Sequence, residues 1–289
     1  MIQTASEKSG AVLLCKPRSK FLSVMTTLKA FFTAALLVVG LAAHAAPPDV
    51  LAKGEVGIVA TVIDGDTVRL KDGSADIRLV GIQAPKLPLG RKGFKAWPLA
   101  EEARQALLAL TQDRQVTLRL GTTARDRNGR TLAHLVREDG VWIQGEMLRQ
   151  GWARVYTFPD NRQLAAELLV LESEARTAKR GIWANDFYAV REAADVTALM
   201  SAINSFQIVV GTVRAVGKTK ERIYLNFGDD FRSDFTISVD KRDWPRFDDA
   251  KLDLSQLKDH AIEVRGWLVS RNGPMIETTH PEQIGAARK

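Results

Sequence analysis

Alternating apolar and polar positions divide the first half of this chain into short strands. The pattern predicts strands at residues 56–62, 67–71, 76–82, 115–120 and 131–137. Apolar residues then recur at helical spacing in three places, which predicts helices near residues 99–110, 142–150 and 164–180. Five short strands with a helix after the third are typical of a small closed barrel of the OB type.

The β pattern returns in the last third of the chain. It predicts strands at residues 206–216, 222–227, 234–240 and 261–270 and a short one near 274–278. We therefore expect a mainly β (α+β) protein with a second small OB-like β domain. The expected organisation is a leader at residues 1–45, an OB-type domain at 54–188, a linker at 189–204 and a second domain at 205–285.

The leader is expected because residues 30–43 are an uncharged apolar run that follows Lys29. Ala43-His44-Ala45 supplies a small-x-small cleavage pattern, and the run is too short to span a bilayer comfortably. A secretory signal peptide, and hence a periplasmic or secreted protein without a stable membrane anchor, is the interpretation. A start at Met25 in place of Met1 would give a signal peptide of ordinary length.

Charge and cysteine content restrict the chemistry. Removing residues 1–45 takes away five basic residues and one acidic residue, so the net charge falls from +7 to +3. Global charge is then weak support for a polyanion partner, and a local site must carry that argument. The single cysteine, Cys15, lies in the leader, which excludes a disulfide framework and a cysteine-rich metal site.

Five short motifs in the first domain occur in one order: IDGDTV (63–68), IRLVGIQAP (77–85), DRNGR (126–130), LRQGWARVY (148–156) and GIW (181–183). With these motifs the chain resembles the staphylococcal nuclease (thermonuclease) family over about residues 54–185. The resemblance implies a protein that cleaves DNA or RNA phosphodiesters with Ca²⁺.

The resemblance also implies roles for individual residues. Asp66 and Asp64 match the acidic metal-site residues, and a hard cation prefers such oxygen ligands. Arg78 and Arg130 match the two phosphate-binding arginines, whose planar forks suit a phosphate. The matches that imply nucleotide contacts are looser: Arg127 for a terminal phosphate, and Tyr156 and Phe158 for base stacking.

Two positions depart from the family pattern. Gln83 stands where the family has its second metal-ligating aspartate, and Lys86 stands where it has its catalytic glutamate. Ca²⁺ binding is therefore expected to be possible but weakened, because the site has lost a formal charge. A charged lysine cannot accept a proton, so Lys86 acts as a base only if neighbouring arginines depress its pKa.

These observations leave three hypotheses open. The first is a nuclease that hydrolyses phosphodiesters with an altered site, for which Asp126, Glu101 or Glu102 is a candidate replacement base. The second is a catalytically inactive binder of single-stranded nucleic acid or another polyanion through the same groove, with Arg91, Lys92 and Lys95 as further contacts. The third is a scaffold whose second domain binds a protein partner of unknown kind.

Overall fold

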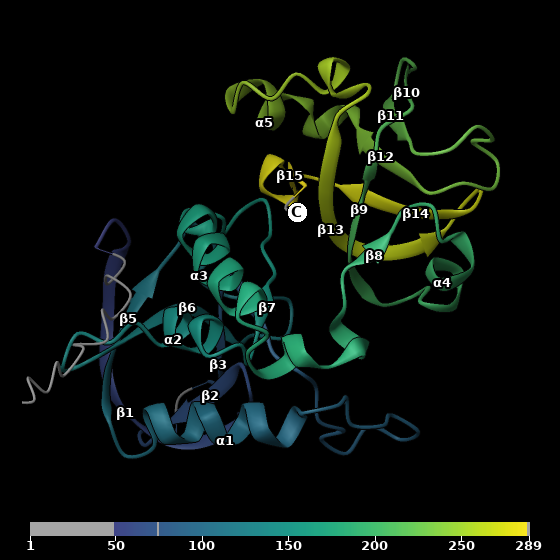
Figure 1. The fold of residues 1–289 in the computed structure, drawn as a ribbon. Coiled ribbons are helices and arrows are strands. Elements are labelled where there is room, and N and C mark those ends of the chain that lie inside the picture. Colours follow the sequence, from purple (N-terminus) through teal and green to yellow (C-terminus); the bar gives the residue numbers. More distant parts are fainter. Residues whose placement is uncertain (1–48, 74, 288–289) are drawn as a thin grey trace, which may run out of the picture. The chain divides into compact units, whose positions relative to one another are not determined.

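A computed structural model describes residues 49–73 and 75–287 of the chain (Figure 1). The predicted signal peptide at residues 1–45, its cleavage site and the alternative start at Met25 lie outside the described residues. Within the described residues, no helix combines the length and apolar character needed to cross a membrane.

The first domain is a closed barrel of five strands in the order β1-β2-β3-β6-β5. These strands are β1 (Ala52–Asp64), β2 (Thr67–Leu70), β3 (Ile77–Leu79), β5 (Gln115–Leu120) and β6 (Thr131–Arg137). The pairs are antiparallel except for β3 and β6, which run parallel. The predicted OB-type barrel is therefore confirmed.

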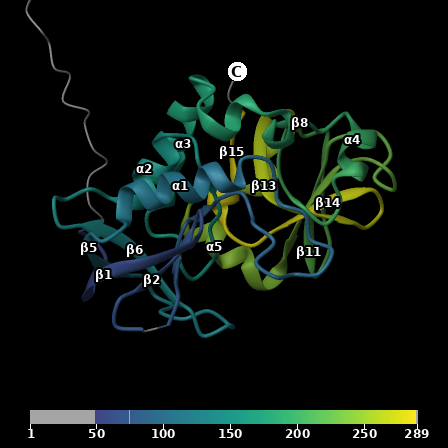
Figure 2. The ribbon, with the colours of Figure 1, turned by 90° about the horizontal axis from the view of Figure 1, so that it is seen from below.

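Three helices accompany the barrel, as expected from the sequence: α1 (Ala100–Thr111), α2 (Ile143–Arg149) and α3 (Ala165–Thr177). Helices α1 and α2 contact β1 and β6, and α3 packs on α2 (Figure 2). Gly151 ends the α2 turn with φ +78, and a Cβ atom there would lie 2.3 Å from the Arg180 carbonyl oxygen. Only glycine meets both requirements without strain, so this position fixes the chain between α2 and the next strand.

A two-stranded ladder outside the barrel positions the residues between the third strand and the last helix. It pairs β4 (Ile82–Gln83) with β7 (Arg154–Val155) in antiparallel register. All four of these residues are buried. The ladder thus brings the QAP and ARVY motifs side by side.

The second domain is a mixed β-sheet in the order β10-β11-β12-β14-β13-β9-β8, with β15 paired to β13. Its elements are β8 (Arg191–Glu192), α4 (Val196–Ser201), β9 (Phe206–Thr212), β10 (Ala215–Lys218), β11 (Arg222–Asn226), β12 (Thr236–Asp240), α5 (Trp244–Asp249), β13 (Ala261–Ser270), β14 (Pro274–Thr278) and β15 (Ile284–Ala286). The expected additional β domain is present, and it has a hydrophobic core separate from that of the barrel.

A buried ion network joins β13 to the barrel domain. Arg265 donates to both carboxylate oxygens of Glu172 on α3, at 3.1 and 2.8 Å, and to Glu263 at 2.8 Å. Arg176 on α3 completes the network through Glu263. Glu172 is fully buried and Arg265 is 4% exposed, so each charge depends on its partners for compensation.

Candidate functional site

The turn between β1 and β2 holds two buried carboxylates. Asp64 and Asp66 are 4% and 0% exposed. The Asp64 side chain accepts a hydrogen bond from the Asp66 backbone N–H at 3.0 Å, which closes a tight local turn. Gly65 is required between them because a Cβ atom there would lie 2.6 Å from the Ala84 Cβ atom. The IDGDTV motif therefore presses against the chain that follows β4.

Lys86 lies on that following chain, and its ammonium group lies among the carboxylate oxygens. Lys86 Nζ is 2.5 Å from Asp66 Oδ1, 2.6 Å from Asp66 Oδ2 and 3.2 Å from Asp64 Oδ2. Ala84 supports the arrangement by donating its backbone N–H to Asp66 Oδ2 at 2.8 Å. The lysine side chain is 18% exposed, so its charge is largely shielded from water. A tethered cation thus compensates part of the negative charge of the carboxylate pair.

Arg78 on β3 supplies a second cation to the same carboxylate. Its NH2 group lies 3.2 Å from Asp66 Oδ2 and 2.7 Å from the Ile82 carbonyl oxygen. Its NH1 group donates to the carbonyl oxygens of Leu79 and Asp66, at 2.5 and 3.2 Å. The guanidinium is therefore engaged with protein oxygens on several sides, and it ties the β1–β2 turn to β4.

Two carboxylates and two cations leave this cluster without net charge, but they affect the two aspartates differently. Burial raises the pKa of Asp66, yet the charges of Arg78 and Lys86 outweigh burial and hold the pKa at about 2. For Asp64, burial and the neighbouring Asp66 charge raise the pKa despite opposition from Lys86 and Arg78. Asp66 is thus the anion of the pair that the cations stabilise most.

Gln83 turns away from the carboxylates toward Arg154. Its Oε1 atom accepts from Arg154 Nε at 3.3 Å and from Arg154 NH2 at 3.0 Å. Arg154 is 4% exposed, and burial lowers its pKa to about 10. The rings of Trp97, Tyr188 and Phe206 surround its guanidinium at 5.9, 5.6 and 4.7 Å from their centroids. Cation–π contacts and one amide oxygen stabilise this buried charge.

The residues of the cluster do not fit a Ca²⁺ ion as they are arranged. Calcium requires six to eight oxygen ligands. Here the Asp66 and Asp64 oxygens face the Lys86 ammonium, and the Gln83 amide oxygen faces Arg154. Residues 49–73 and 75–287 contain no group of three histidine, cysteine, aspartate or glutamate side chains that could hold a metal ion.

The other candidate residues for phosphate binding and catalysis lie on nearby loops and on α1. Arg130 is bound by Asp126, with a 2.7 Å contact from Nε, and this pairing also orders the DRNGR turn. Arg127 is exposed on that turn. Glu101, one of the candidate replacement bases, instead binds Arg104 and Gln105 at the start of α1. Asp126 and Glu101 are thus already held by cations or amides of their own segments.

Tyr156 and Phe158 follow β7 and lie together. Their ring centroids are 4.8 Å apart in an edge-to-face arrangement, and Phe158 is 52% exposed. Tyr156 donates its backbone N–H to the Gly81 carbonyl oxygen at 2.9 Å. The ladder that links β4 to β7 therefore places this aromatic pair beside the chain that carries Gln83 and Lys86.

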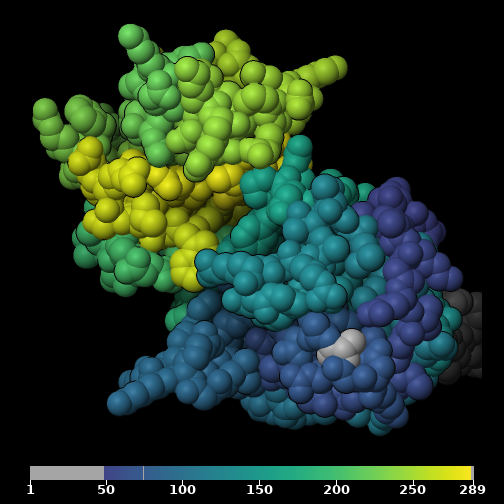
Figure 3. Space-filling model, turned by 180° about the vertical axis from the view of Figure 1, so that it is seen from behind, coloured from purple at the N-terminus to yellow at the C-terminus, as the bar shows by residue number. Residues whose placement is uncertain are grey.

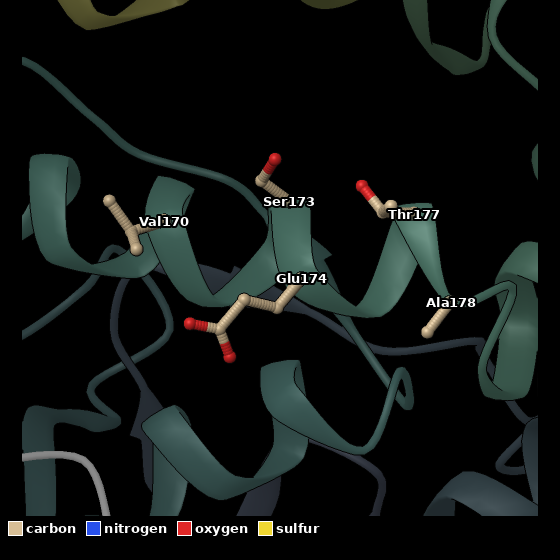
Figure 4. Close-up of a pocket in the computed structure, with 5 residues that line it drawn as sticks. All are labelled: Val170, Ser173, Glu174, Thr177 and Ala178. Atoms are coloured by element: carbon tan, nitrogen blue, oxygen red, sulfur yellow. The ribbon is translucent and has the colours of Figure 1, made fainter.

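A cavity of about 570 Å³ lies along α3 and shares no lining residue with this cluster (Figure 4). Its lining side chains are Val170, Ser173, Glu174, Thr177 and Ala178, which share one face of the helix. Glu174 is the single ionisable group among them. This lining combines one carboxylate with small and hydroxyl-bearing side chains and is separate from the carboxylate cluster.

The barrel, the Asp-Gly-Asp turn and the arginine on β3 define an OB-type barrel with a nuclease-like site, and the comparisons identify its family. The family model described as Staphylococcal nuclease homologue matches residues 76–185. An uncharacterized endonuclease of Escherichia coli is 33% identical over 131 residues, which cover 45% of this chain and 77% of that protein. The chain belongs to the staphylococcal nuclease family.

Two further relatives differ in how much of their own length matches this chain. The thermonuclease of Staphylococcus intermedius is 28% identical over 138 residues, covering 45% of this chain and 77% of that protein. Endonuclease YhcR of Bacillus subtilis is 31% identical over 148 residues, covering 48% of this chain but 12% of that protein. The chain thus spans about an eighth of the length of YhcR.

Sequence reasoning did not identify Arg154 or the second domain as part of the site region. Arg154 lies in the LRQGWARVY motif, between the buried residues Ala153 and Val155. A charged residue between two apolar strand residues is the signal that could have identified it. Phe206 and Trp267 come from β9 and β13, and no local sequence pattern indicates their proximity to β7.

Proposed function

We propose that this chain is an exported member of the nuclease family that binds single-stranded nucleic acid without Ca²⁺. One observation carries the proposal: the Lys86 ammonium lies within 2.6 Å of both oxygens of Asp66. A bound metal ion and this ammonium compete for the same oxygens. The charge that a metal would supply is therefore already provided by the chain.

Two loops of the barrel domain carry exposed cations that suit a polyanion. Arg91, Lys92 and Lys95 are exposed on the loop that follows Lys86. Arg127 is exposed on the turn between β5 and β6, next to Arg130. Phosphate contacts from such loops supply sequence-independent affinity, and aromatic rings beside them stack on bases. Family membership supports nucleic acid, either DNA or RNA, as the polyanion.

The test measures binding and cleavage together. Mature protein is mixed with single-stranded DNA and RNA, in Ca²⁺ or in a chelator, and both affinity and chain cleavage are followed. We expect the same affinity in both conditions and no acceleration of cleavage by Ca²⁺. Calcium-stimulated cleavage by the parent protein would contradict the proposal.

Salt dependence locates the contact surface. Replacing Arg127 or Lys95 with alanine is expected to reduce the slope of log affinity against log salt by about 0.7 for each lost phosphate contact. The matched control is Arg242→Ala, which removes a 79%-exposed arginine from the second domain. Unchanged slopes in the Arg127 and Lys95 variants would show that nucleic acid binds elsewhere.

Phosphodiester hydrolysis by the altered site is the second candidate function. It is favoured by the endonuclease and thermonuclease names of the relatives. In that case the parent cleaves nucleic acid in the presence of a chelator, and Lys86→Ala abolishes the cleavage while exposed-loop variants do not. Chelator-resistant cleavage that survives Lys86→Ala would exclude a catalytic role for Lys86.

Export is proposed from the sequence pattern of residues 1–45, with cleavage near Ala45 or Ala46. N-terminal sequencing of the protein from its host tests this. An intact N-terminus on protein retained in the cytoplasm would reject export.

A further inference from the structure

A cavity of about 300 Å³ is lined by residues of both domains. From the barrel domain it is lined by Tyr156 and Phe158, and from the second domain by Phe206 and Trp267. Figure 3 shows the C-terminal residues, in yellow, next to teal segments of the barrel domain. The volume is at the lower end of the range of about 300–1,000 Å³ for small-ligand pockets. The cavity is therefore large enough for one small ligand or one ring-sized part of a larger ligand.

Two of the four rings are open to solvent. Trp267 is 44% exposed and Phe158 is 52% exposed, although large aromatic side chains are normally buried. Tyr156 packs edge-to-face on Phe158 and Phe206, with centroids 4.8 and 5.0 Å apart. Trp267 is fixed by a 2.9 Å hydrogen bond from Nε1 to Tyr156 Oη. The rings are thus held by each other and still offer surface to a flat ligand.

The second domain is held firmly enough to form a wall of the cavity. Arg265, which lines the cavity, is held by its buried pair with Glu172, and His280 Nε2 is 2.8 Å from Thr157 Oγ1. Arg162 adds a 2.6 Å ion pair with Glu282. These contacts position Trp267 relative to Phe158 before any ligand arrives.

The polar groups of the cavity are already hydrogen-bonded within the protein. Gln283 accepts from the Thr279 N–H and donates to the Arg265 carbonyl oxygen. His280 is bound to Thr157, and Glu277 is paired with two arginines. A ligand therefore gains stacking contacts rather than hydrogen bonds that would identify one particular ring.

The cavity is connected by contacts to the β4–β7 ladder. Arg154 donates to Gln83 on one side and lies 4.7 Å from the Phe206 ring centroid on the other. Tyr156 is bound to Gly81, two residues before Gln83. The aromatic cavity therefore adjoins the β4–β7 ladder, and Lys86 of the carboxylate cluster follows Gln83 of that ladder in the sequence.

We propose that Trp267 of the second domain extends the stacking surface of the Tyr156–Phe158 pair in this cavity, and that it is the affinity-determining residue for one base of a single-stranded nucleic acid. The proposal rests on the proposed nucleic-acid binding and adds to it a role for the second domain. Because stacking tolerates every base, the subsite gives affinity without strong sequence preference.

The experiment compares an oligothymidylate with an abasic strand of equal length, both in a chelator at fixed salt. The two strands carry the same phosphates, so only the oligothymidylate can fill the cavity. We expect Trp267→Ala to weaken oligothymidylate binding by about 5- to 150-fold and to leave binding of the abasic strand unchanged. Trp267→Phe, which keeps a ring, is expected to retain most of the affinity.

Phe231→Ala is the matched control, because it removes a 55%-exposed ring of the second domain that does not line the cavity. Thermal unfolding checks that each variant folds. If Trp267→Ala does not fold, quenching of tryptophan fluorescence by oligothymidylate is compared between the parent and Trp267→Phe. Loss of the quenching in that variant supports the same contact.

The outcomes distinguish failure of the cavity proposal from failure of the proposed nucleic-acid binding. Equal binding of both strands by the parent, or equal oligothymidylate binding by the parent and the folded variants, overturns the cavity proposal and leaves nucleic-acid binding standing. A parent that binds neither strand overturns both proposals. A strong preference for one base in place of broad tolerance overturns recognition by stacking alone.

Discussion

Lys86 Nζ lies 2.5 Å from Oδ1 and 2.6 Å from Oδ2 of Asp66, a carboxylate with 0% exposure. The lysine stands at the sequence position where the family resemblance places a catalytic glutamate. In this chain its charge points inward and compensates the aspartate that the resemblance assigns to the metal. Lys86 thus provides a counter-ion at a position where the resemblance implies a proton acceptor.

The stability of the barrel should depend on this ion pair. Removing one partner of a buried pair typically costs about 3–5 kcal/mol, because the other charge is left uncompensated. We expect Lys86→Ala to lower the free energy of unfolding by about 3 kcal/mol, since Arg78 still contacts Asp66. Denaturant unfolding measures this. Lys92→Ala, on the exposed part of the same loop, is the control and should change it by less than about 0.5 kcal/mol.

His280 should make folding sensitive to mild acid. Burial, together with Arg162 and Arg246, lowers its pKa to about 4 from 6.5. The neutral form is favoured in the folded state, so the stabilisation is present above pH 6.5 and is lost as pH falls toward 4. The shift in the His280 pKa corresponds to a contribution of about 3 kcal/mol to the free energy of unfolding.

The measurement is the free energy of unfolding against pH for the parent and His280→Gln. Between pH 6.5 and 4, the free energy of unfolding should fall less steeply for His280→Gln than for the parent. His260→Gln is the control because His260 is exposed. Parallel curves for the parent and His280→Gln would refute the assignment.

Glu172 is expected to couple the two domains. Glu172→Gln leaves the buried Arg265 with a weaker partner. This substitution should lower the free energy of unfolding by about 3–5 kcal/mol. Glu277 also pairs with two arginines, but its side chain is 43% exposed. Glu277→Gln should therefore lower the free energy of unfolding by no more than about 1 kcal/mol. Denaturant midpoints compare the two. Equal losses would mean that burial does not determine the strength of these networks.

Local patterns were sufficient to predict the barrel and its three helices. Strand alternation and the five ordered motifs depend on residues close in the sequence, and Asp64, Asp66, Arg78 and Lys86 are brought together by the fold that those motifs define. The partner of Gln83 was not predictable in this way. Arg154 lies 71 residues further along the chain, and its hydrogen bond to Gln83 depends on the β4–β7 pairing.

The second domain was predictable as β structure but not in its contacts. Trp267 and Tyr156 are 111 residues apart, and nothing in either local pattern indicates their hydrogen bond. The same holds for Arg265 and Glu172. The register between strands that are distant in the sequence determines which residue a charged or aromatic side chain contacts. The hydrophobic pattern around that side chain does not identify its contact partner.

Gln83→Glu should convert an amide contact into an ion pair. The buried Arg154 guanidinium has Gln83 as its hydrogen-bond acceptor, and a carboxylate of the same shape is a stronger one. We expect a gain of about 1 kcal/mol in unfolding free energy.

The control for this change is Gln144→Glu. Gln144 is also buried, but its amide N–H donates to the Ala133 carbonyl oxygen, so the carboxylate loses a donor and the protein should become less stable. Destabilisation by Gln83→Glu would show that Arg154 does not need a negative partner.

The most direct test of whether Lys86 takes the place of a metal ion is a calcium titration of the thermal unfolding midpoint for the parent, Lys86→Ala and Lys92→Ala. Ligand that binds the folded state raises the midpoint, by several degrees once its concentration exceeds the dissociation constant about tenfold. We expect no calcium-specific rise for the parent and Lys92→Ala, and a clear rise for Lys86→Ala, in which the Asp64 and Asp66 oxygens are released. A parent that Ca²⁺ stabilises as much as it stabilises Lys86→Ala would contradict the claim that Lys86 takes the place of the metal.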